Sequence, residues 1–144
     1  PLEAPWQGAY AFPTPQALAQ VPLAALRELG LGYRDRYVAQ CAMRVAQEPQ
    51  CLDAIAALPL DQARSALCTF AGVGAKVADC ILLFSMDKWD AFPQDVWIRR
   101  VAREQYGLSG AALAARFGQN AGYAQQMLFY AARMEAAGKK EERK

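Results

Sequence analysis

The sequence predicts an all-α fold of about eight helices in one compact domain. Every periodic segment repeats its apolar residues three and four positions apart, which is the spacing of one face of a helix. No segment shows the convincing alternation of apolar and polar residues that marks a strand. With 144 residues, of which 54% are hydrophobic and 21% charged, the chain can form a real core and is typical of a folded globular protein.

The first expected helix follows an irregular lead-in, residues 1–12, that is rich in proline, glycine and aromatic residues. Thr14 followed by Pro15 has the pattern of a helix cap with proline in the first helical position. A short helix over 22–29 should end at Gly30, because glycine adopts the left-handed conformation that closes helices. In the segment 34–47 the apolar residues fall on one stripe, which predicts a helix with one buried face.

The remaining helices are expected at 51–58, 61–69, 75–86, 95–106, about 110–117 and 121–137. The helical domain is therefore expected to cover residues 1–137. The charged run over 138–144 predicts a solvated, flexible tail.

The composition limits which partners and metal sites can be expected for this chain. A formal net charge of +2 does not by itself indicate a polyanionic partner, although eleven of the sixteen cations are arginine, which suits phosphates and base edges. The absence of histidine and of any C-x-x-C pair removes the usual zinc patterns, so no side-chain metal site is expected. The apolar surroundings of the four cysteines predict buried free thiols in a reducing compartment, at Cys41, Cys51, Cys68 and Cys80. Neither a signal peptide nor a membrane-spanning apolar run is present.

The segment Gly72-Val73-Gly74-Ala75-Lys76 places a Gly-x-Gly turn between two expected helices. Such a turn leaves backbone N–H groups free at the start of the second helix, where they can bind a phosphate. Lys76 falls in the first turn of that helix, where the helix dipole disfavours a cation. Together with the carboxylate of Asp95, this lysine suggests a nucleophile that acts on nucleic acid.

Four segments, taken in order, resemble the helix-hairpin-helix glycosylases that remove 8-oxoguanine from DNA. They are Leu29-Gly-Leu-Gly-Tyr-Arg-Asp-Arg-Tyr37, Gly72-Val-Gly-Ala-Lys-Val-Ala-Asp-Cys80, Phe92-Pro-Gln-Asp95 and Gly122-Tyr-Ala-Gln-Gln-Met-Leu-Phe129. The resemblance implies DNA base-excision repair, in which 8-oxoguanine opposite cytosine is removed and the strand is cleaved by β-elimination. It also implies that the protein is a monomer that binds double-stranded DNA and is located inside the cell, in association with DNA. No membrane association and no required cofactor are expected.

The resemblance gives the two catalytic roles to Lys76 and Asp95. Lys76 would attack C1′ of the flipped nucleotide and form a Schiff base, and burial in the site would favour its neutral form. Asp95 would stabilise the cationic sugar, while on structural grounds alone it is a good N-cap for the helix that follows. The alternative for Lys76 is a surface lysine beside a phosphate contact.

The resemblance also implies a pocket for the flipped base. Gln125 would read the Watson–Crick edge of the base, and Phe129, one helical turn later, would stack on its ring. Cys80 would cover the opposite face, and the pocket would include Phe84 and Pro93. Without the resemblance, Phe129 reads as a core residue and Cys80 as a structural thiol.

Two further contacts with DNA follow from the resemblance. Tyr33 would wedge into the base stack, and Arg34 would hydrogen-bond to the orphaned cytosine. The alternative is a tyrosine that packs under a loop and a solvated arginine. The backbone of Gly72, Val73 and Gly74 would hold a DNA phosphate, and hairpin carbonyls would be able to hold a monovalent cation.

The sequence also departs from the family. Ala71 stands where the family usually has proline, and Trp97 stands where relatives often have a histidine that meets a phosphate. The family pattern extends upstream of Pro1, so we expect the chain to be N-terminally incomplete relative to the family, and less stable and less selective for oxidised guanine.

Two other functions are open. One is a related lysine-dependent glycosylase for another lesion, although the branch with an iron–sulfur cluster is disfavoured because the last cysteine is Cys80. The other is a non-catalytic helix-hairpin-helix fragment that only binds DNA, which would need neither Lys76 nor Asp95.

Overall fold

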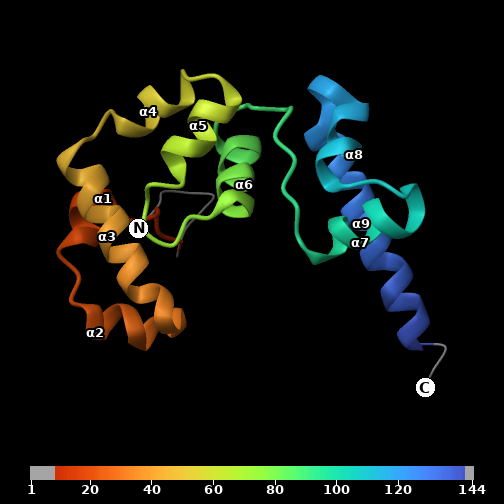
Figure 1. Cartoon of the computed structure of the whole chain (residues 1–144). Coiled ribbons are helices and arrows are strands. Elements are labelled where there is room, and N and C mark those ends of the chain that lie inside the picture. The colour runs from red at the N-terminus through yellow and green to blue at the C-terminus, as the bar shows by residue number, and fades with distance from the viewer. Residues whose placement is uncertain (1–8, 142–144) are drawn as a thin grey trace. The chain divides into compact units, whose positions relative to one another are not determined.

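The computed structural model describes the backbone of residues 9–141 and the side chains of residues 9–138 (Figure 1). All regular structure in this part is helical, which confirms the all-α prediction. The elements in chain order are α1 (Pro15–Ala19), α2 (Leu23–Leu26), the π-turn η1 (Arg27–Leu31), the 3₁₀ turn η2 (Gly32–Arg34), α3 (Asp35–Gln47), α4 (Cys51–Ala56), α5 (Leu60–Leu67), α6 (Ala75–Ser85), α7 (Val96–Tyr106), α8 (Gly110–Phe117), the 3₁₀ turn η3 (Gly118–Asn120) and α9 (Ala121–Glu141).

The structure divides into two compact units, where the sequence predicts one. The first unit consists of Pro1–Ala54 and Phe70–Gly72. In it, α1 and α2 both pack against α3. Thr14 Oγ1 caps α1 by accepting a hydrogen bond from the Ala17 N–H at 3.2 Å, and Pro15 occupies the first turn, as the sequence predicts.

A tight loop joins α2 to α3 in the first unit. The helix expected over 22–29 changes after Leu26 into a π-turn, in which Gly30 has a φ of +80°. Only glycine adopts this backbone without strain, so Gly30 ends the helix as predicted. The 3₁₀ turn that follows exposes Tyr33 before α3 begins.

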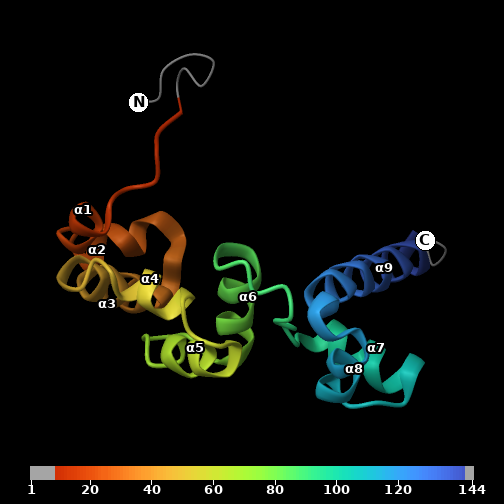
Figure 2. The same ribbon diagram turned by 90° about the horizontal axis from the view of Figure 1, so that it is seen from above.

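The second unit consists of Ile55–Thr69 and Val73–Lys144. In it, α5 and α6 lie side by side, and α7, α8 and α9 pack on one another (Figures 1 and 2). The side chains buried among these last three helices are Phe92, Ile98, Ala102, Leu113 and Ala121. None of the described helices is both long enough and apolar enough to cross a bilayer.

The last helix is longer than predicted. α9 continues to Glu141, four residues beyond the expected end at 137. Lysine and glutamate are good helix formers, and they extend the helix past Gly138. The residues 142–144 of the expected tail, and residues 1–8 of the expected lead-in, lie outside the described part of the chain.

Gly122, in the first turn of α9, packs against the backbone of the segment that leads to Asp95. Its N–H donates to the carbonyl of Trp89 at 2.8 Å. A Cβ at this position would lie 2.9 Å from the Trp89 oxygen and 3.0 Å from the Ala91 oxygen, and would also collide with Leu83. Backbone atoms cannot turn aside as a flexible side chain can.

We therefore expect Gly122→Ala to lower the free energy of unfolding by up to about 2 kcal/mol. Overpacking costs about 1–3 kcal/mol, while alanine in a helix regains about 1 kcal/mol. The matched control is Gly138→Ala in the same helix, where no atom lies within 4 Å of the new Cβ. Urea unfolding should show opposite signs for the two variants, and a stabilised Gly122→Ala would contradict this packing.

Candidate functional site

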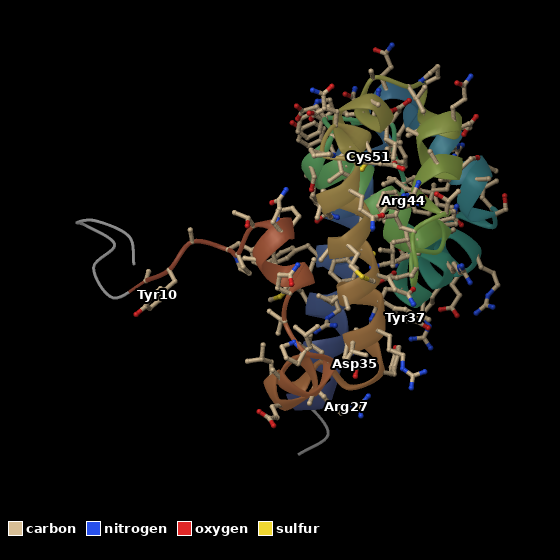
Figure 3. The ribbon with its side chains drawn as sticks, turned by 90° about the vertical axis from the view of Figure 1, so that its left-hand side faces the viewer. Tyr10, Arg27, Asp35, Tyr37, Arg44 and Cys51 are labelled. Carbon is tan, nitrogen blue, oxygen red and sulfur yellow. The ribbon has the colours of Figure 1, made fainter. Side chains whose placement is uncertain are left out.

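In the first unit, side chains of α3 contact residues 70–72, the segment that leads into the Gly-x-Gly turn. The Arg44 guanidinium lies 3.9 Å above the centre of the Phe70 ring, and Cys41 Sγ contacts the Ala71 carbonyl oxygen at 3.6 Å. Tyr37, which Figure 3 labels further toward the start of α3, covers Gly72. Burial raises the pKa of the Cys41 thiol, and the charge of Arg44 offsets this only in part.

Of the two glycines of the turn, only Gly72 is required by its backbone and its surroundings. Gly72 has a φ of +76°, and a Cβ there would run into the Tyr37 ring, so no other residue fits. Gly74 is the N-cap of α6, and no atom lies within 4 Å of the place its Cβ would take. No side chain caps this helix start. The first N–H groups of α6 are therefore open to an anion, as the phosphate prediction requires.

Three candidate residues share one face of α6, because they are four positions apart. Lys76 and Phe84 are exposed, and Cys80 is half-buried. The expected burial of Lys76 is not observed in this structure. No ion pair joins Lys76 to Asp95 among the side chains of residues 9–138.

On another face of α6, Asp79 forms an ion pair with Arg64 of α5. Arg64 donates from Nε to Asp79 Oδ1 at 2.6 Å and also pairs with Asp61. Burial raises the pKa of Asp79, and the hydrogen bond and charge of Arg64 counteract this only in part. This brace fixes α5 against α6 and thereby the helix that carries Lys76.

Asp95 performs the capping role that its sequence position predicts. Its Oδ1 accepts a hydrogen bond from the Ile98 N–H at 2.9 Å, at the first turn of α7. The residues before it, Phe92 and Pro93, are buried. The carboxylate, itself half-buried, is thus held at a fixed place on the second unit.

Gln125 and Phe129 lie one turn apart on α9, as predicted, but both already have protein partners. Gln125 is only 3% exposed, its Nε2 donates to the Pro93 carbonyl at 3.1 Å, and its Oε1 accepts from Gln126. Phe129 is half-buried and packs against the core among α7, α8 and α9. This hydrogen bond brings Pro93, another predicted pocket residue, next to Gln125 on α9. Reading and stacking of a flipped base by these residues stay predictions.

The other two candidates, Tyr33 and Arg34, belong to the first unit. Tyr33 is 70% exposed, with Arg34 Cζ 4.8 Å from its ring centre and the Tyr37 ring edge-on at 6.1 Å. Their loop is closed by an ion pair, in which Arg27 Nε and Nη2 donate to Asp35 Oδ2 at 2.9 and 2.7 Å (Figure 3). Asp35 is buried, and its Oδ1 accepts from the Arg36 N–H at 2.7 Å.

The ion pair of Asp35 with Arg27 stabilises the first unit to an extent that depends on pH. Burial raises its pKa, but the hydrogen bonds from Arg27 and the Arg36 N–H, with the charges of both arginines, outweigh burial and leave the pKa below its usual value. A group with a lowered pKa stabilises the fold at a pH above its unfolded value of about 3.9 and stops doing so as the pH falls through the folded value.

We therefore expect Asp35→Asn to destabilise the protein at pH 7, with a difference from the wild type that shrinks below about pH 4. The measurement is the midpoint of urea unfolding at several pH values. Asp53→Asn, at an exposed aspartate of α4, is the matched control and should follow the wild type throughout. A difference that is independent of pH would contradict this role of the ion pair.

Sequence reasoning missed the residues that support the site rather than form it. The signal for Asp79 was a lone carboxylate within an apolar helical run, and the signal for Asp35 was a carboxylate next to a predicted contact residue. The prediction of four buried thiols was wrong. All four cysteines are free, but Cys68, in the C-cap position of α5, is exposed and the other three are half-buried. Among the described residues no group of three or more Cys, Asp or Glu side chains could hold a metal ion.

Comparison with known proteins gives concordant matches. A family profile described as "HhH-GPD superfamily base excision DNA repair protein" matches residues 2–117. The chain is 41% identical over 115 residues to a probable N-glycosylase/DNA lyase of Methanothermobacter thermautotrophicus, a match that covers 75% of this chain and 36% of that protein. It is 32% identical over 138 residues to the N-glycosylase/DNA lyase OGG1 of Arabidopsis thaliana, covering 83% of this chain and 38% of the relative.

Solved structures agree with these relatives. The 8-oxoguanine glycosylase/lyase of Clostridium acetobutylicum, in complex with double-stranded DNA containing cytosine opposite 8-oxoG, is 35% identical with a TM-score of 0.84. That match covers 94% of this chain and 49% of the other. The chain thus spans between about a third and a half of the length of these relatives.

Proposed function

Because the chain belongs to the HhH-GPD superfamily of base excision DNA repair proteins, we propose that it removes 8-oxoguanine opposite cytosine from double-stranded DNA and cleaves the strand as a lyase. The observation that carries this proposal is the start of α6. It combines an uncapped helix terminus, open to a phosphate, with the exposed amine of Lys76 in its first turn. The backbone N–H groups of a helix start can bind a phosphate without a side chain, which leaves the amine available as a nucleophile.

The proposed chemistry begins with the neutral amine of Lys76. Its lone pair forms a bond to C1′, and the bond from C1′ to the base breaks, so that the base leaves with the electron pair and takes up a proton. The nitrogen gives up one of its two protons, the bond from C1′ to O4′ then breaks with O4′ taking up a proton, and the opened sugar is left as a protonated Schiff base. Loss of a proton from C2′ expels the 3′ phosphate and cuts the strand.

In this proposal Asp95 stabilises the positive charge that develops on the sugar. Its cap on α7 fixes the carboxylate, which therefore needs no reorganisation as charge appears. Tyr33 and Arg34 would fill the vacated stack and pair with cytosine, and Gln125, Phe129, Cys80, Phe84 and Pro93 would form the pocket. For Gln125, entry of a base requires exchange of the hydrogen bond to the Pro93 carbonyl.

The partner in this proposal is double-stranded DNA. The protein would act on it as a monomer, in the compartment that contains the DNA. The lysine supplies the nucleophile, so no cofactor takes part in the steps above. A monovalent cation at the hairpin carbonyls stays a prediction. One of these carbonyls, that of Ala71, already contacts Cys41 Sγ and keeps one lone pair for such an ion.

The proposal is tested by borohydride trapping of the wild-type protein on three duplexes of equal length. They carry 8-oxoguanine opposite cytosine, an abasic site opposite cytosine, and undamaged guanine opposite cytosine. We expect a covalent adduct with the first two and none with the third. An adduct on the abasic duplex alone would support the lyase and overturn the lesion assignment. No adduct on any duplex, from folded protein, would overturn catalysis.

A second candidate is a DNA-binding module without turnover or without lesion selectivity. Two observations favour it: Lys76 has no ion pair with Asp95 in the described part of the chain, and the Gln125 amide is engaged with protein. Binding of all three duplexes with equal affinity, without an adduct, would support this candidate.

A further inference from the structure

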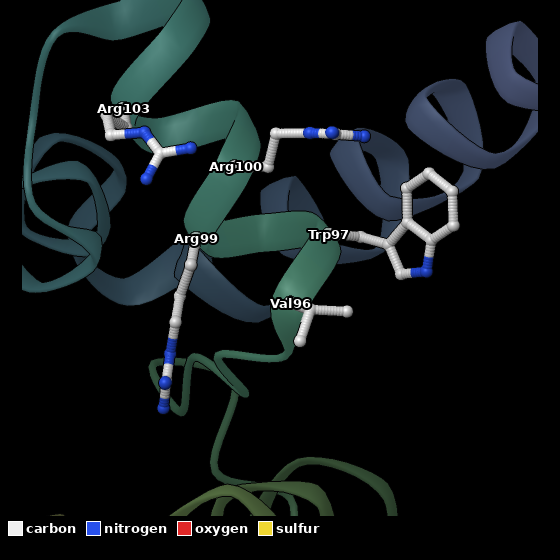
Figure 4. Close-up of a pocket in the computed structure, with 5 residues that line it drawn as sticks. All are labelled: Val96, Trp97, Arg99, Arg100 and Arg103. Atoms are coloured by element: carbon white, nitrogen blue, oxygen red, sulfur yellow. The ribbon is translucent and has the colours of Figure 1, made fainter.

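Basic side chains gather on one face of α7, away from its buried face. Val96, Arg99, Arg100 and Arg103 are spaced three and four positions apart and therefore form a stripe along the helix. All four are exposed, and with Trp97 they line an open hollow of about 460 Å³ (Figure 4). We call these five residues the α7 stripe. The opposite face of the helix is buried through Ile98, Val101 and Ala102.

The positive charge of the stripe is not neutralised within the second unit. Arg100 and Arg103 both lie near one carboxylate, that of Glu104, at 3.5 and 3.1 Å, and all three side chains are more than half exposed. Exposed pairs of this kind contribute little and leave the guanidinium groups free to exchange partners. Arg99 forms no ion pair with any described residue.

A fourth arginine adds to the charge from α9. Arg133 Cζ lies 5.5 Å from the Trp97 ring centre. Glu135 on the same helix lines a smaller cavity together with Arg100 and Glu104. Four arginines against the two glutamates and Asp95, which precedes the helix, therefore leave an excess of one positive charge here, in a chain whose whole formal net charge is +2.

From this arrangement we propose that the α7 stripe binds the sugar–phosphate backbone of duplex DNA, outside the contact made by the Gly-x-Gly turn. Arginine donors match phosphate oxygens, and the apolar surfaces of Val96 and Trp97 suit the deoxyribose between phosphates. The stripe begins directly after Asp95, so DNA whose sugar reaches Asp95 lies at the start of this helix. The inference rests on the proposed function, since it needs DNA at that carboxylate.

The test is the salt dependence of binding to an undamaged duplex, for the wild type and for the triple variant Arg99→Gln, Arg100→Gln, Arg103→Gln. Each phosphate contact contributes about 0.9 to the slope of log K against log salt, so the slope should fall by about 2 to 3 in the triple variant. The corresponding triple lysine variant keeps the charges and should keep most of the slope. Circular dichroism establishes that each variant is folded.

The matched control is Arg116→Gln, which removes an exposed arginine of α8. It should leave the slope within about 0.3 of the wild type, far less than one contact of about 0.9. An unchanged slope in the triple variant would overturn the inference, as would an equal loss per charge in the control. If the wild type traps abasic DNA and the slope does not change, only the α7 stripe is excluded. If the wild type binds no DNA, both proposals fail.

Discussion

Lys76→Gln should abolish the borohydride-trapped adduct and lower the rate of strand cleavage by about 10³-fold or more, the order expected when an acting nucleophile is removed. Glutamine is similar in length but has no amine that can attack C1′. Because Lys76 is exposed and makes no ion pair with a described residue, its replacement should hardly disturb the fold.

Stability should even rise slightly in this variant. A cation in the first turn of a helix is disfavoured by about 0.3–1 kcal/mol, and glutamine removes it. The matched control is Lys88→Gln, which replaces a half-buried lysine outside α6 and should trap as the wild type does. An adduct that persists in Lys76→Gln would mean that another amine is the nucleophile.

Asp95→Asn should separate the two roles of this residue. Asparagine is as good an N-cap as aspartate, so the hydrogen bond to the Ile98 N–H can persist, and only the charge is lost. Stability should fall by no more than about 1 kcal/mol, the contribution of an anion at a helix start. The single-turnover rate of base release should fall by about 10²–10³-fold, the loss expected when a placed electrostatic stabiliser is removed.

Asp95→Ala loses the cap as well and should cost about 1 kcal/mol more in unfolding free energy, with a rate similar to that of Asp95→Asn. The matched control is Ser109→Ala. Ser109 caps α8 by accepting from the Ala112 N–H at 3.1 Å, so this variant loses a cap but no carboxylate. It should be destabilised and keep its rate. If Asp95→Asn kept the wild-type rate, Asp95 would be a cap only.

Local features of the sequence determined most of the helical fold. Thr14, Pro15, Gly30 and Asp95 act through their own backbone preferences and their nearest neighbours, so their caps and stops are where the sequence predicts them. The period of apolar residues likewise predicted α3 and α6. The end of α9 was missed by four residues because the charged run 138–141 reads as a solvated tail, although it also consists largely of good helix formers.

What only the tertiary structure decided are the contacts between residues far apart in the chain. Burial of a polar group is tolerable only if another element supplies its partner, and no local pattern names that partner. Thus Asp79 is paired by Arg64 from α5, and the Gln125 amide is taken up by the Pro93 carbonyl, 32 positions away. Packing likewise decided that Lys76 and the arginines of the α7 stripe are exposed. The sequence by itself predicted the hairpin turn and the helix that carries Lys76, because short motifs act locally, while packing decided which of their side chains are exposed.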